Sequence, residues 1–248
     1  MKQFLAILIL LVSALGWSQL EEAPFDEGIK AYNNKDYVKA QELFSALVKE
    51  HPENPSLLFN LGLAEYHLGS KGLALGLWRK ARFLDPNHPG LSTAIDFAEA
   101  EMFPGQPEDS VFATLDHWLR ALPMDGWFFL SFLLFTVLGW QTVTYFAKRK
   151  LPLTQWPYWY YSLIPLWLFC LGFSFWLYLD AKVIRATIVG SEVFSHSGPS
   201  ASSPTFSELD EGLLVTVKRR QDDWALIESP TGSPGWVSVN ELVIMERL

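Results

Sequence analysis

The sequence predicts a multi-domain chain: an all-α repeat array, a two-helix transmembrane hairpin and a small all-β barrel, in that order. Three observations predict this. Residues of one type recur 34 positions apart near the N-terminus, two apolar runs flank a basic loop, and short β-branched or aromatic runs fill the C-terminal region. Half of the 248 residues are hydrophobic and 19% are charged, which favours membrane segments over an ordinary soluble protein.

The first residues have the pattern of an export signal. Lys2 gives the positive start, residues 4–15 are apolar, and small residues follow at cleavage spacing. We expect residues 1–18 to be a signal peptide, with an uncleaved signal anchor as the alternative. Both interpretations place the following residues on the outer side of a cytoplasmic membrane.

A 34-residue period is that of the tetratricopeptide (TPR) unit, which contains two antiparallel helices. We expect a TPR solenoid over residues 21–102, with repeats at 21–54 and 55–88 and a capping helix at 89–102. Because about three repeats are usually needed for stability, this cap, a partner or self-association should complete the core. The recurring pairs are Gly28/Gly62, Ala40/Ala74, Phe44/Trp78 and Pro52/Pro86.

Residues 109–122 have their apolar side chains on one helical face. Two interpretations stay open for this segment. It is an amphipathic helix on the outer membrane surface, or a helix packed against the repeats.

Residues 124–147 and 156–179 are each long and apolar enough to cross a membrane. The loop between them contains Lys148, Arg149 and Lys150, and positive residues in short loops stay in the cytoplasm. The predicted topology therefore has the repeats outside, the basic loop inside and the C-terminus outside.

Residues 183–248 contain short runs typical of strands, separated by Gly, Pro, Ser and Asp turn signals. Several short strands in a segment of this length predict a small barrel. The four runs are Ala186–Val189, Leu213–Val217, Trp224–Glu228 and Trp236–Val239.

This C-terminal region resembles a bacterial SH3 domain. The family typically has an asparagine, a valine and an arginine just before a Ser-Gly-Pro-Ser motif. Here Val193-Phe194-Ser195-His196 stands in that region, so the ligand preference of the family does not carry over to this chain. Trp224 is expected to offer a stacking surface to an extended peptide or a glycan strand, with a core role as the alternative, and Trp236 is expected in the core. The matching residues are SGPS at 197–200, Leu209 and Gly212 before a strand, Asp223-Trp224, and Gly235-Trp236-Val237.

The whole order of segments resembles the E-type protein of bacterial aerotolerance (Bat) operons. This resemblance implies a stress-related or aerotolerance-related setting in the periplasm. It also implies that this protein is a membrane-bound partner of von Willebrand A-type proteins and of an associated MoxR-type ATPase.

No reactive constellation stands out in the sequence. There is no HExxH, GxSxG, P-loop or dinucleotide glycine pattern, and the five histidines do not form a ligand set by spacing. The single cysteine, Cys170, excludes an intramolecular disulfide, and a net charge of −8 suits nucleic acid poorly. We expect no catalysis, cofactor, metal or nucleic-acid binding.

Binding to other proteins is the expected activity. The first helices of the repeats would line a groove whose apolar strip and acidic edges suit a partner helix with basic flanks. The alternative is that its apolar residues are core between helices. The groove residues are Phe25, Asp26, Ile29, Phe59, Asn60 and Leu63.

These expectations combine into a membrane-anchored scaffold that holds envelope proteins at the outer face of the bacterial inner membrane. The alternative is a cell-wall sensor whose barrel binds peptidoglycan. The predicted cytoplasmic loop, residues 148–157, is too short for a signalling domain, which favours the scaffold.

Overall fold

The computed structural model describes residues 22–104, 119, 122, 124–148 and 158–246. These residues form two compact units. One joins the residues up to Pro104 to those from Ile184 onward, and the other contains the residues between them. The predicted signal peptide lies outside the described residues, and so does the predicted helix at 109–122 apart from Leu119 and Leu122.

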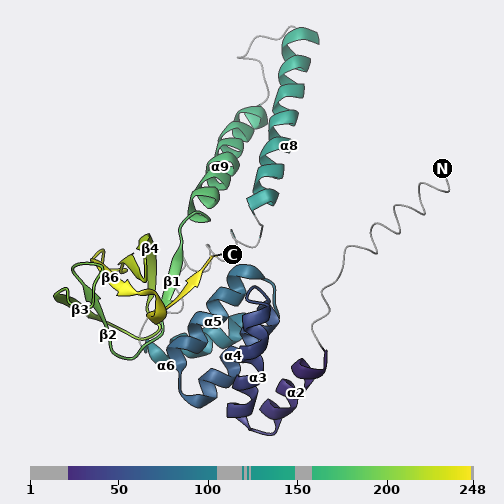
Figure 1. Cartoon of the computed structure of the whole chain (residues 1–248). Coiled ribbons are helices and arrows are strands. Elements are labelled where there is room, and N and C mark those ends of the chain that lie inside the picture. Colours follow the sequence, from purple (N-terminus) through teal and green to yellow (C-terminus); the bar gives the residue numbers. More distant parts are fainter. Residues whose placement is uncertain (1–21, 105–118, 120–121, 123, 149–157, 247–248) are drawn as a thin grey trace, which may run out of the picture. The chain divides into compact units, whose positions relative to one another are not determined.

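The N-terminal part of the first unit is helical, and each helix packs on the next one along the chain (Figure 1). We call these helices the helical array. The predicted segments 21–54, 55–88 and 89–102 contain two, two and one of them, while their assignment as TPR repeats stays a prediction. The helices are α2 (Glu22–Asn33), α3 (Tyr37–Glu50), α4 (Pro55–Leu68), α5 (Lys71–Leu84) and α6 (Leu91–Met102).

Local sequence explains the helix boundaries. The Asp36 carboxylate accepts the backbone N–H of Lys39 at 3.2 Å and caps α3. Asn54 caps α4 in the same way, and Pro55 follows at the first helical position, where its missing N–H costs nothing. Gly69, with φ 94°, ends α4 in the left-handed conformation that favours glycine.

The recurring glycines and aromatics meet each other within the array. A Cβ at Gly28 would lie 2.8 Å from the Phe44 ring, and a Cβ at Gly62 would overlap the Trp78 indole. Trp78 is also held by a 3.1 Å hydrogen bond from its Nε1 to the backbone oxygen of Phe59. The 34-residue spacing thus marks two equivalent contacts, each between the two helices of one hairpin.

The C-terminal part of the first unit is a seven-stranded antiparallel sheet with the order β3-β2-β6-β5-β4-β1-β7 (Figure 1). The four predicted runs correspond to β1, β4, β5 and β6, whereas β2, β3 and β7 were not predicted. We call this sheet the barrel. The strands are β1 (Arg185–Ile188), β2 (Val193–His196), β3 (Thr205–Leu209), β4 (Leu214–Gln221), β5 (Trp224–Glu228), β6 (Pro234–Ser238) and β7 (Leu242–Met245).

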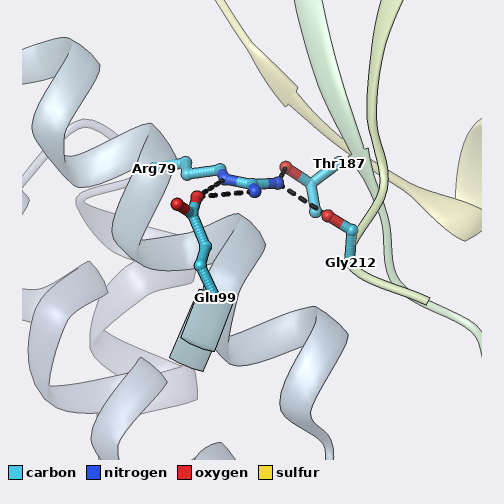
Figure 2. A network of polar contacts seen from close by, with 4 residues as sticks. All are labelled: Arg79, Glu99, Thr187 and Gly212. Carbon is cyan, nitrogen blue, oxygen red and sulfur yellow. Dashed lines mark hydrogen bonds and ion pairs between the residues drawn. The ribbon is translucent and has the colours of Figure 1, made fainter. Parts of the chain in front are cut away.

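The helical array and the barrel pack together through α5, which contacts β1 and β7. At their contact the guanidinium of Arg79, only 8% exposed, lies between α6 and the barrel (Figure 2). Its Nε and Nη2 donate to Glu99 Oε1 at 3.1 and 2.7 Å. Its Nη1 donates to Thr187 Oγ1 at 3.2 Å and to the backbone oxygen of Gly212 at 2.7 Å. Sequence analysis did not predict this packing.

The second unit is a pair of helices, α8 (Met124–Val143) and α9 (Tyr158–Asp180), with a π-helical turn η1 (Thr144–Lys148) after α8. Both are long and apolar enough to cross a membrane, a statement that rests on length and composition alone. The two helices contact each other, and small residues on them are buried: Ser131 on α8, and Cys170 and Ser174 on α9. Of the basic loop, Arg149, Lys150 and the side chain of Lys148 lie outside the described part of the chain.

Replacing Gly62 with alanine should destabilise the helical array. Alanine is normally favoured over glycine in a helix by about 1 kcal/mol, but the added methyl group overlaps buried Trp78, and overpacking costs about 1–3 kcal/mol. The added Cβ would overlap Trp78 Nε1 severely, so the cost falls in the upper part of that range, about 2–3 kcal/mol. We therefore expect a net loss of about 1–2 kcal/mol, measured by unfolding of the detergent-solubilised chain under circular dichroism. Gly139→Ala is the control, because no atom of the described residues lies within 4 Å of its added Cβ. Equal stability of Gly62→Ala and wild type would contradict this contact.

Candidate binding site

The barrel has one face of large side chains that its core does not use. In β5 the buried residues are Ala225 and Ile227, so Trp224 and Leu226 point to the opposite side. In β6 Val237 is fully buried, and Trp236 before it is only partly buried. The prediction that Trp236 belongs to the core is therefore wrong, because the alternation along β6 assigns the core position to Val237.

The strand register brings these side chains together with β2. Trp236 is opposite Leu226 on one side and His196 on the other. The rings of His196 and Trp224 lie 5.2 Å apart and nearly perpendicular. Phe194, two residues before His196 on the same strand, is 42% exposed. We call Phe194, His196, Trp224, Leu226 and Trp236 the outer barrel face.

His196 gives this face a defined polar atom. Its Nδ1 lies 3.0 Å from the backbone oxygen of Ser203. A carbonyl oxygen only accepts, so Nδ1 carries the proton and the neutral ring keeps Nε2 as an acceptor. The register of β2 against β3 shifts between Ser195 and His196, a bulge of the kind that redirects side chains. Aromatic surface beside a polar acceptor suits an extended peptide or a sugar strand.

The residues predicted for the helical groove lie mostly at the edge of the core. Phe25, Ile29, Phe59 and Leu63 are partly buried and pack against the buried residues of the array. This favours the core interpretation for all four, although their exposed edges still contribute surface. Asp26 is exposed.

Asn60, the remaining groove residue, is occupied within its own helix. Its Nδ2 donates to the backbone oxygen of Ser56 at 2.7 Å. A partner that uses this amide would have to replace that bond.

A row of rings crosses α2, α4 and α6. Tyr32 and His67 are 5.6 Å apart, His67 and Tyr66 are 6.2 Å apart, and Tyr66 and Phe97 are 5.9 Å apart, all between ring centroids. Phe97 at its end is 61% exposed. We call Tyr32, Tyr66, His67 and Phe97 the aromatic strip. Because it is continuous over three helices, the aromatic strip is a better candidate for a protein-binding surface on the array than the predicted groove.

Sequence reasoning missed Phe97, although a signal was present. Ile29, Leu63 and Phe97 are separated by 34 residues each, so Phe97 continues the series that marks the groove. The weak repeat pattern of residues 89–102 predicts only a cap, so this signal is easily overlooked.

Polar contacts hold the aromatic strip in place. Tyr66 donates its hydroxyl to Glu101 on α6, and Lys71 Nζ donates to the same carboxylate at 2.6 Å. Burial, together with the bond to Glu101, raises the pKa of Tyr66 to about 12. Hydrogen bonds from Lys71 and then Tyr66 lower the pKa of Glu101. At neutral pH the contact is therefore a neutral phenol donating to a carboxylate.

Within the described ranges, no group of three or more His, Cys, Asp or Glu side chains is placed to hold a metal ion. The outer barrel face and the aromatic strip consist mainly of rings, with the imidazoles of His67 and His196 and the hydroxyls of Tyr32 and Tyr66 as polar groups, which favours binding by stacking and hydrogen bonding.

Comparison with known proteins agrees with the all-β architecture of this antiparallel sheet. Residues 189–243 match the bacterial SH3 domain family. No curated protein and no solved structure matches the chain. The SH3 match indicates a role in binding proteins or the cell wall.

The raised pKa of Tyr66 makes a prediction at alkaline pH. A group whose pKa is raised by folding contributes stability below its ordinary pKa of 10.0, and loses it as pH rises to about 12. The free energy of unfolding of wild type should therefore fall more steeply over this window than that of Tyr66→Phe, which has no phenol to ionise. Chemical unfolding at a series of pH values measures the difference. Parallel curves for the two proteins would contradict the contact with Glu101.

Proposed function

We propose that this protein is a membrane-anchored scaffold for protein–protein interaction at the outer face of the bacterial cytoplasmic membrane. In this proposal α2–α6 form TPR repeats with a cap, α8 and α9 are the membrane anchor, and the SH3-like barrel is a second binding module. The protein acts by binding and not by catalysis. The likeness in segment order to the E-type Bat protein supports a setting among von Willebrand A-type membrane proteins.

One observation carries this proposal: Arg79 on α5 bonds to Thr187 and Gly212 of the barrel (Figure 2). Arg79 comes before the two apolar helices in the chain, and Thr187 and Gly212 come after them. Two modules in contact must lie on the same side of a membrane, and a chain that crosses twice returns to the side it left. The contact and the two apolar helices thus support the same arrangement. The predicted export signal and the basic loop at 148–150 favour the outer side for both modules.

The aromatic strip is the proposed docking surface for protein partners. Aromatic residues, phenylalanine among them, are enriched at the centres of protein interfaces. The helix that carries Phe97 contains three acids and no lysine or arginine. Glu99 and Glu101 are already paired with Arg79 and Lys71, whereas Asp96, next to Phe97, is exposed. A partner with an apolar anchor beside a basic residue complements this surface.

A cell-wall sensor is the second candidate function, and the outer barrel face favours it. Bacterial SH3 domains commonly bind peptidoglycan or other proteins. The perpendicular Trp224 and His196 rings and the exposed Phe194 provide apolar surface on which a sugar or peptide strand packs.

Reporter fusions test the arrangement in the membrane. A fusion after Lys150 should be active in the cytoplasm, and fusions after Pro104 and after Leu248 should report the outer side. Substituting Lys148, Arg149 and Lys150 together by glutamine should weaken this preference, because positive loop residues set the orientation. Opposite sides for the last two fusions would exclude the scaffold as proposed.

Binding measurements on the full chain in mild detergent separate the two functions. A scaffold should co-purify with von Willebrand A-type proteins, and Phe97→Ala should reduce their affinity at least about tenfold, since it removes an exposed anchor. Phe83→Ala, an exposed aromatic at the end of α5, is the matched control. If instead the chain is retained on purified peptidoglycan, and Trp224→Ala abolishes retention while Leu214→Ala in the same barrel does not, the sensor is the better account.

A further inference from the structure

Helix α5 presents one narrow face to the barrel. Gly72, Gly76 and Arg79 follow one another at spacings of four and three residues, so they share a side of the helix. A Cβ at Gly76 would lie 2.9 Å from the Cβ of Val243 and 3.4 Å from the Cβ of Thr187. Only glycine fits this approach of helix to strands without movement.

The barrel also completes the start of α5. Ser70 is the N-cap residue, but its side chain makes no capping bond. Glu211, in the turn before β4, takes this role, and its Oε1 accepts the backbone N–H of Gly72 at 2.5 Å. A carboxylate at a helix N-terminus accepts an otherwise unpaired N–H. Its negative charge also interacts favourably with the positive end of the helix dipole. The residue that caps α5 thus lies 139 positions away in the sequence.

The apolar core of the array extends to the same turn of the barrel. A Cβ at Gly212 would lie 2.7 Å from Met102 Cε and 3.3 Å from Leu75 Cδ2. Leu75 is fully buried, and Gly212 has φ 79°, a conformation that favours glycine. Removing the barrel would expose Leu75, leave α5 without its cap and deprive the Arg79 guanidinium of two acceptors.

We propose that the helical array and the barrel are one cooperative folding unit that is discontinuous in sequence, with the membrane hairpin inserted between its two parts. The barrel takes the place of the further repeat that a two-repeat array lacks. This inference does not depend on which partner the protein binds. It has one consequence for binding: a ligand that recognises only the folded barrel also stabilises the array, because the two unfold together.

Hydrogen exchange of the detergent-solubilised full chain tests the proposal. Val237 belongs to the buried core of the barrel, so Val237→Ala removes buried volume there. We expect this substitution to lower the amide protection of α5, residues 71–84, at least tenfold. The protection of β5 and β6 should fall by a similar factor. Leu138→Ala, at an equally apolar site of the hairpin, should leave α5 at its wild-type protection.

The reverse experiment starts from the helix. Arg79→Met should lower amide protection in β1 and β7 at least tenfold, whereas Arg82→Met, an exposed arginine one turn later, should not. Complete unfolding of the barrel in Val237→Ala still gives an answer, since the proposal requires α5 to lose protection with it. Wild-type protection of α5 in Val237→Ala, or of β1 and β7 in Arg79→Met, would overturn the proposal.

Discussion

The buried guanidinium of Arg79 is the constraint on which the larger unit of this protein depends. A charge removed from water is costly unless it is paired and its donors are satisfied. Burial lowers the pKa of Arg79, and the carboxylate of Glu99 opposes this shift. The acceptors come from α6, β1 and the turn before β4, so the arginine is satisfied only when all three segments are in place. Such a contact favours one arrangement of helices and sheet over others that would leave the charge unpaired.

This arrangement gives the protein two aromatic surfaces on one body. The aromatic strip crosses α2, α4 and α6, and the outer barrel face crosses β2, β5 and β6. Because α5 contacts β1 and β7 directly, the two surfaces belong to one compact unit and are not joined by a linker alone. Binding then loses less conformational entropy than it would with two modules on a flexible linker.

Local and periodic features of the fold were predictable, and long-range contacts were not. The spacing of Gly62 and Trp78 from their counterparts located the helices, and apolar runs located α8 and α9. Strand β3 was missed because only Leu209 of its five residues is buried, so it shows no alternation. The contact between Arg79 and Gly212 joins residues 133 positions apart, which no periodicity reports. Gly72 and Gly76 were the available signal, since glycine is unfavourable inside a helix unless something approaches closely.

The insertion of the hairpin between two parts of one unit also fixes the order of events during biosynthesis. The ribosome releases α5 long before the turn that contains Glu211 and Gly212. Until the last strands have been made and have reached the same compartment, the glycine face of α5 and Leu75 stay open to water or to other proteins. In a newly made chain, this face of α5 therefore lacks its native neighbour until synthesis of the barrel is complete.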